Sequence, residues 1–184
     1  MIDRPSLKEF QTAAKYLKSI IVHTPLIPYR GGDHDTKILL KPEILQAVNS
    51  FKLRGVFNAV ASLSAEEKAK GVSTVSAGNT AQALAWTARY FGISARTIMP
   101  DTAPPPKIEA VKAYGGTPVL IPMPEVFRFL QEHLWEQETY SFIHPWTNRH
   151  VMIGHGSLGL EIMHDAPDVE TVFIPVGGGG LMGG

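Results

Sequence analysis

Residues 71–100, "GVSTVSAGNTAQALAWTARYFGISARTIMP", decide the fold. The apolar run "VSTVS" at 72–76 predicts a short strand, and "ARTIMP" at 95–100 predicts another. The segment 80–91 between them has a helical period of apolar residues. These residues would form one face of a helix: Ala81, Leu84, Ala85, Ala88 and Phe91. A strand, a helix and a second strand in this order indicate parallel pairing across a helical crossover.

The same alternation continues on both sides of this unit. Further helices are predicted at about 6–17, from 50, at 64–71, over 103–116, at about 124–138 and near 156–163. Further strands are predicted in "KILLKPE", "TPVLIP" and "TVFIPV". The last, at 171–176, is too apolar for an edge strand and is typical of a central strand in a covered parallel sheet. The predicted fold class is therefore α/β, with open, mostly parallel sheets flanked by helices.

Composition narrows the possible functions. The 184 residues include 17 Lys and Arg against 17 Asp and Glu, so no overall field favours nucleic acid or an anionic membrane. The absence of cysteine excludes disulfides, thiolate metal sites and a cysteine nucleophile. The N-terminal sequence lacks the apolar core of a signal peptide, and no apolar run could span a bilayer. Five histidines between His133 and His164 lack zinc-site spacing. We expect a cytoplasmic protein without a metal site.

The stretch 49–55, "NSFKLRG", places an amine in an unusual position. Ser50 is a good helix N-cap, so Lys52 falls in the first turn, where the helix dipole disfavours a cation. One explanation is an ordinary exposed lysine, and for Lys52 considered alone it is the more frequent one. The other is that the amine is kept neutral and nucleophilic. Arg54 is expected to have a structural role.

Two loops could bind anionic groups. The segment 76–80, "SAGNT", follows a strand and begins a helix, so its hydroxyls, amide and free N–H groups could hold a carboxylate, although a simple capped turn is the alternative.

The run 177–180 follows an apolar segment and could cradle a phosphate with backbone N–H groups, unless it is a flexible tail. Gly178, Gly180 and Gly183 also fit a dinucleotide-binding pattern, but that pattern belongs after the first strand of a fold. A phosphate cradle, a carboxylate loop and a neutral lysine together favour pyridoxal phosphate (PLP) and an amino acid as ligands.

Four motifs in order carry a family resemblance: "KPEILQAVNSFKLRG", "SAGNTAQALAW", "HPWTNRHVMIGHGSLGLEI" and "VGGGGLMGG". From about Thr24 to the last residue, the chain resembles the threonine/serine dehydratase branch of fold-type II PLP enzymes, which includes serine racemase. The resemblance implies a tryptophan-synthase-beta-like fold with a large PLP domain, 1–60 and 148–184, and a small inserted domain, 61–147. Since the family continues past its phosphate loop, the unit is expected to be incomplete at its C-terminus. The full-length form is expected to be a homodimer or a larger oligomer.

The resemblance also implies roles for individual residues. Lys52 would form the Schiff base with PLP, Phe51 would pack near the cofactor ring, and Asn79 would bond the 3′-oxygen of PLP. The substrate carboxylate would be bound by Ser76, Ala77, Gly78, Asn79 and Thr80. The phosphate would be bound by Gly177, Gly178, Gly179, Gly180 and Leu181.

The implied reaction is conversion of a threonine- or serine-type hydroxy amino acid to a 2-oxo acid and ammonia, with Lys52 removing the α-proton.

Several residues depart from the family pattern, so other functions than dehydration stay open. Thr80 stands where dehydratases commonly carry histidine and resembles cysteine-synthase relatives, so a β-replacement enzyme is one alternative. Because the family continues past the phosphate loop, a non-catalytic fragment is another. Ala77 stands where serine racemases carry a serine base, which disfavours racemisation. His155 and Ser157 replace the usual Gln and Thr of their motif, which bears on substrate choice.

Overall fold

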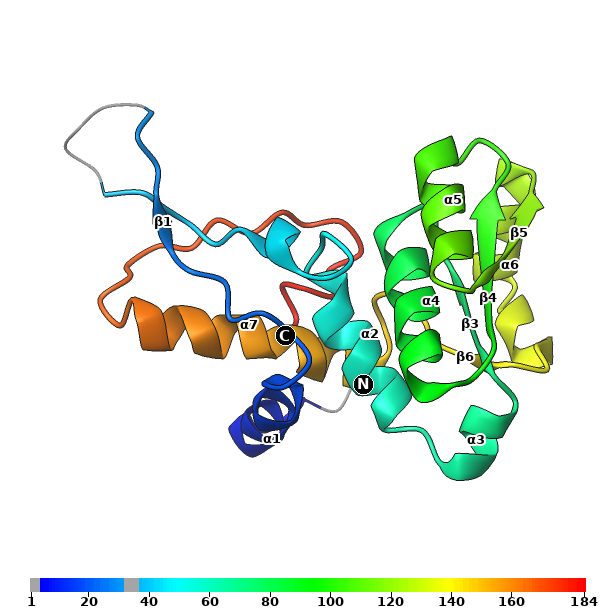
Figure 1. Ribbon diagram of the computed structural model, residues 1–184, viewed down its shortest axis with the longest axis horizontal. Coiled ribbons are helices and arrows are strands. Elements are labelled where there is room, and N and C mark those ends of the chain that lie inside the picture. Colours follow the sequence, from blue (N-terminus) through cyan, green and yellow to red (C-terminus); the bar gives the residue numbers. More distant parts are fainter. Residues whose placement is uncertain (1–3, 32–36) are drawn as a thin grey trace.

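A computed structural model describes residues 4–31 and 37–184 and divides them into two lobes (Figure 1). One lobe contains a two-stranded antiparallel sheet and three long helices, and the other contains a parallel sheet with its covering helices. The elements of the first lobe are α1 (Leu7–Leu17), β1 (Ile27–Pro28), β2 (Leu39–Leu40), η1 (Glu43–Leu45), α2 (Lys52–Ala61) and α7 (Arg149–Asp165). Those of the second are α3 (Ala65–Ala69), β3 (Val72–Val75), α4 (Asn79–Phe91), β4 (Ala95–Pro100), α5 (Pro105–Ala113), β5 (Thr117–Ile121), α6 (Met123–Gln131), η2 (Leu134–Gln137) and β6 (Ser141–Phe142).

The second lobe is built on a four-stranded sheet in the order β5-β4-β3-β6, with all neighbours parallel. In Figure 1, α4 and α5 cover one face of this sheet and α6 lies on the other. Val75 and Ile98 pack against α6, and Met99 packs against α4 and α5, because successive side chains of a strand point to opposite faces. The α/β class and the mostly parallel pairing are confirmed.

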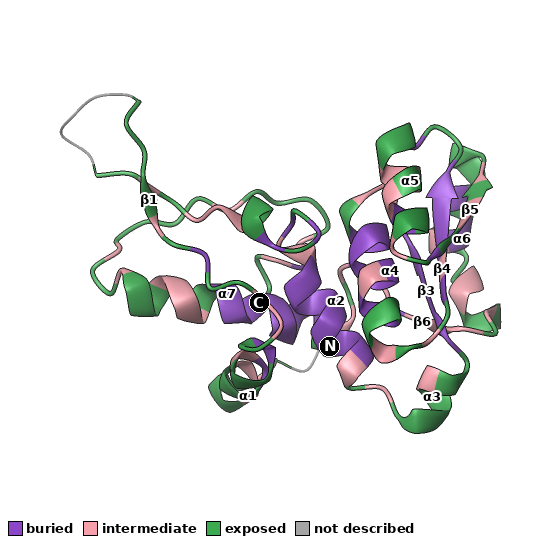
Figure 2. Ribbon diagram, in the orientation of Figure 1, coloured by how far each residue is buried: buried purple, intermediate pink, exposed green. Residues whose placement is uncertain are grey.

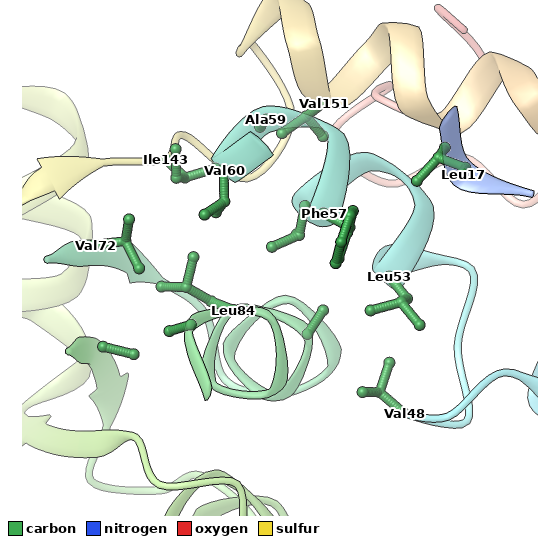
Figure 3. Close-up of a cluster of buried hydrophobic side chains, with 14 residues drawn as sticks. Leu17, Val48, Leu53, Phe57, Ala59, Val60, Val72, Leu84, Ile143 and Val151 are labelled. Atoms are coloured by element: carbon green, nitrogen blue, oxygen red, sulfur yellow. The ribbon is translucent and has the colours of Figure 1, made fainter. Parts of the chain in front are cut away.

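A buried cluster joins the two lobes through α2 and α4. Figure 3 shows Leu53 and Phe57 of α2 facing Leu84 of α4, with Val60 beside Val72 of the sheet. Helix α2 also packs along α7, and the facing halves of both helices are buried (Figure 2). The start of α2 is therefore fixed relative to both α7 and α4, which begins at the candidate residue Asn79.

Helix α7 begins earlier than the sequence predicts. The expected start was near Gly156, whereas α7 begins at Arg149, with the Asn148 side chain accepting a hydrogen bond from the N–H of Val151 (3.1 Å). Glycine lowers helix propensity, so the sequence did not indicate a helix before Gly156. Close packing of α7 on α2 explains the glycine at 154, because a Cβ there would lie 2.4 Å from the carbonyl oxygen of Arg54. The predicted helix at 124–138 is likewise interrupted, with a left-handed residue at His133 between α6 and η2.

The predicted central strand at 171–176 is wrong in this structure. These residues form no regular element and most are exposed, with Phe173 94% exposed. A strand requires a neighbour for its backbone N–H and C=O groups, and no described strand pairs with this segment. The apolar sequence alone could not provide that partner. The domain boundaries at 60 and 147 remain a prediction.

Candidate active site

Lys52 is the first residue of α2. Its backbone N–H donates to the hydroxyl of Ser50 (3.2 Å), but the N-cap residue is Phe51 and its side chain makes no capping bond, so the prediction that Ser50 is the N-cap is wrong. The Lys52 side chain is half-buried, and its Nζ lies 5.1 Å from the centre of the Phe51 ring. Burial lowers the pKa of the Lys52 amine, and no described carboxylate forms an ion pair that would offset this. The position favours a neutral amine, which is the nucleophilic form.

Arg54 lies two residues further along α2 and has the opposite environment. Its guanidinium is fully buried and donates to Glu43 (2.7 and 2.8 Å) and to Glu161 (2.7 and 3.0 Å). The same group also donates to the hydroxyl of Ser157 (3.2 Å). This pairing gives Arg54 the structural role that the sequence suggested.

His155 of α7 lies beside Phe51, with their rings edge-to-face and 5.0 Å apart. The residue is 1% exposed, and within the described chain neither ring nitrogen has a hydrogen-bond partner. Burial, with the charges of Lys52 and Arg54, lowers the pKa of His155 to about 3, so the ring is neutral at physiological pH. The neutral ring of His155 therefore lies near the Lys52 amine, and its two nitrogens could still donate and accept one hydrogen bond each.

The segment 76–80 closes the turn between β3 and α4. The Ser76 hydroxyl accepts a hydrogen bond from the N–H of Gly78 (3.1 Å), and no side chain caps the first turn of α4. The unpaired N–H groups of that turn, with the helix dipole, are suited to a carboxylate. Ala77 and Asn79 are exposed, whereas Thr80 is only 4% exposed and turns toward the interior. The backbone and Asn79 therefore offer more contact than the Thr80 hydroxyl.

Two residues at these loops were missed in the sequence. Lys107 of α5 donates a hydrogen bond to the side-chain oxygen of Asn79 (2.8 Å). Trp146 lies against the glycine segment, where a Cβ on Gly178 would come within 2.6 Å of its ring. Both contacts join segments that are distant in sequence, and neither residue has a local pattern that predicts its partner.

The glycine segment 177–180 has the properties of an anion cradle. Gly179 has a positive φ of 84°, and a Cβ on Gly177 or Gly179 would meet open space. No described backbone carbonyl accepts a hydrogen bond from the N–H groups of these four residues. The residues that follow the segment pack on α7, since a Cβ on Gly184 would clash with the Met152 carbonyl oxygen. Free N–H groups on this support fit a phosphate.

The three groups lie around the beginning of α2. In the view of Figure 1, the start of α4 and the red C-terminal segment are both near the N-terminal end of α2. No hydrogen bond or ion pair among the described residues joins Lys52, the 76–80 segment and the glycine segment directly. The core under α2 packs α2 against α4, whereas the glycine segment lies against Trp146. An amine with a lowered pKa, the exposed Asn79 amide and a segment of unpaired backbone N–H groups are compatible with the groups that PLP requires.

Residues 4–31 and 37–184 contain neither a membrane-spanning helix nor a cluster of metal ligands. No helix there has the length and apolar character needed to span a membrane. No cluster of three or more His, Asp or Glu side chains in those ranges is arranged to hold a metal ion.

Comparison with known proteins places the chain in a family. Residues 17–184 match the family described as pyridoxal-phosphate dependent enzyme. The chain is 40% identical over 188 residues to the L-threonine ammonia-lyase of Thermotoga maritima, covering 97% of this chain and 45% of that protein. It is 42% identical over 183 residues to a catabolic L-threonine dehydratase of Staphylococcus aureus, covering 97% and 53%.

A solved structure agrees with this placement. The serine racemase of Dictyostelium discoideum superposes with a TM-score of 0.84 at 34% identity, over 96% of this chain and 58% of that one. The chain spans about half the length of the curated relatives it matches. The chain therefore belongs to the pyridoxal-phosphate-dependent enzymes of fold type II, in the branch that resembles threonine dehydratases and serine racemases.

Proposed function

We propose that the protein is a PLP-dependent dehydratase that converts a threonine- or serine-type hydroxy amino acid to a 2-oxo acid and ammonia. The observation that carries this proposal is Lys52, a half-buried amine with a lowered pKa at a helix start, with no described carboxylate paired to it. The names of the relatives from Thermotoga maritima and Staphylococcus aureus support the substrate class.

The cofactor would be held at its two ends by different elements. The backbone N–H groups of 177–180 and of Leu181 would bind the phosphate, and Lys52 Nζ would bind the other end covalently. Phe51, which borders both Lys52 and His155, would pack near the ring. Asn79 would donate from its amide nitrogen to the 3′-oxygen of the cofactor.

The substrate carboxylate would bind at 76–80. The open first turn of α4 supplies backbone donors there, and its dipole favours the negative charge. A carboxylate bound at this place would fix the orientation of the substrate relative to Lys52.

Bound PLP supplies the electron withdrawal that makes the α-proton removable. The neutral Nζ of Lys52 then accepts that proton as a general base, which a permanently protonated lysine could not do. Ala77 presents only a methyl group at the position where a second base would be needed to return a proton to the opposite face. Dehydration is therefore favoured over racemisation.

The test is covalent trapping of PLP. The protein is incubated with PLP and reduced with borohydride, and the modified lysines are identified by peptide mass spectrometry. We expect the label on Lys52 and its loss in Lys52→Ala, together with loss of 2-oxo acid formation from threonine or serine. Lys112→Ala is the matched control, because Lys112 is exposed and Glu109 is the carboxylate that it pairs with among the described residues. Labelling spread over exposed lysines, or undiminished 2-oxo acid formation in Lys52→Ala, would refute the proposal.

A further inference from the structure

Lys107 is the one cation that contacts the carboxylate loop in the described chain. It lies in the first turn of α5, and its stem carbons are 4.0 Å from where a Cβ of Gly78 would lie. Its Nζ donates to Oδ1 of Asn79 at 2.8 Å, across 28 residues of sequence. No described carboxylate pairs with it, whereas Lys112 on the same helix pairs with Glu109 at 2.9 Å. The Lys107 ammonium is therefore directed at Asn79 rather than at a surface acid.

This contact determines which way the Asn79 amide points. A carboxamide has an accepting oxygen and a donating nitrogen, and the two ends are otherwise nearly interchangeable in shape. An ammonium can only donate, so the oxygen must face Lys107. The NH2 group is then turned to the other side of the amide, where it can donate to an anionic oxygen.

We propose that Lys107 is a positioning residue that holds Asn79 with its NH2 group toward the 3′-oxygen of PLP. The inference rests on the proposed function, which places Asn79 at that oxygen. Without Lys107 the amide could turn over and present its oxygen to an anionic oxygen, which is repulsive. A residue outside the four sequence motifs would in this way control a cofactor contact made within one of them.

Two measurable consequences follow from the direction of the amide. Loss of one hydrogen bond to the cofactor weakens PLP binding by about tenfold or less, as expected for a single partly exposed bond. A donor to an anionic oxygen also stabilises its deprotonated form. Removing the donor therefore raises the pH at which the visible absorption of bound PLP changes.

The experiment measures both quantities in a double-mutant cycle. Lys107→Met, Asn79→Ala and the double variant are compared by absorption titration with PLP and by the pH dependence of the bound spectrum. Lys112→Met is the control on the same helix. Lys107→Met should weaken PLP binding and raise the pH midpoint, and it should have no further effect once Asn79 is replaced. Lys107→Ala repeats the test if the Met variant folds poorly.

Other outcomes overturn the inference and are separate from failure of the proposed function. An unchanged midpoint in Lys107→Met beside a shifted one in Asn79→Ala would show that Lys107 does not position the amide. Equal effects of Lys107→Met in both backgrounds would show that it acts independently of Asn79. No effect of Asn79→Ala would remove Asn79 from the cofactor site. In each case, the proposed function is tested separately by whether borohydride traps PLP on Lys52.

Discussion

Arg54 and Lys52, both near the start of α2, have opposite electrostatic surroundings. Around Arg54, the guanidinium is fully buried and bonded to the carboxylates of Glu43 and Glu161, and Lys41 also reaches Glu161 at 2.8 Å. Around Lys52, the neighbours are Phe51 and the neutral ring of His155, and no described carboxylate is paired with the amine. Two residues on one helix thus have contrasting surroundings.

The difference shows what each region is suited to do. A buried charge is tolerated when a partner compensates its lost hydration, so Arg54 stays charged and ties α2 to η1 and α7. An amine buried without a partner shifts toward its neutral form instead. The first region supports the fold, and the second keeps a nucleophile available beside it.

The largest expected effect is on stability when Arg54 is replaced. Arg54→Met removes the guanidinium, which leaves the largely buried Glu43 without a cation and Glu161 with Lys41 alone, and this costs about 3–5 kcal/mol in the free energy of unfolding. The matched control is Lys52→Met, which removes an amine that forms no ion pair with a described carboxylate and should change stability by less than about 0.5 kcal/mol. Urea denaturation of both variants measures the contrast. Similar losses of unfolding free energy in the two variants would show that the surroundings of Arg54 and Lys52 do not differ as described.

A smaller effect should appear in the pH dependence of stability through His155. The folded ring has a pKa of about 3, whereas an unfolded histidine titrates near 6.5. Below pH 6.5 the unfolded chain binds a proton at this residue and the folded one does not, so acid destabilises the protein until the pH reaches the folded value. Between pH 7 and 5 this amounts to about 2 kcal/mol.

The measurement is urea denaturation at pH 7, 6 and 5 for the protein and for His155→Gln. The variant cannot titrate at this residue, so the difference between the two curves isolates His155 from the other groups that titrate in this range. Parallel curves would mean that His155 is not held neutral in the folded protein.

The sequence predicted the elements whose signals are local. The helix expected at 80–91 is α4, Asn79–Phe91, and the flanking strands β3 and β4 are where the apolar runs indicated, because period and composition are read within one segment. The segment 171–176 has the same kind of apolar sequence but no partner strand among the described residues. Strand formation depends on that partner, and no property of the six residues encodes it.

The candidate site was predictable to a similar extent. Lys52 was singled out by the rule that a cation is disfavoured at a helix start, and burial adds to the effect in the structure. The contact of Lys107 with Asn79 and that of Trp146 with the glycine segment arise only when α5 and the turn before α7 are folded against their neighbours. The environment of His155 likewise depends on how α7 crosses α2. Tertiary contacts of this kind leave no periodic signal in the sequence.

The smallest expected effect is in chemical reactivity, and it tests the Lys52 region directly. Burial lowers the pKa of Lys52, so its amine should become reactive toward an acylating reagent at lower pH than the exposed Lys112, which pairs with Glu109. Acylation of each lysine is followed by peptide mass spectrometry across a range of pH, and each rate is scaled to its own plateau. This scaling removes the slower access to a half-buried group. A midpoint for Lys52 equal to that of Lys112 would indicate a hydrated or paired amine, and the start of α2 would then not favour the neutral form that a nucleophile requires.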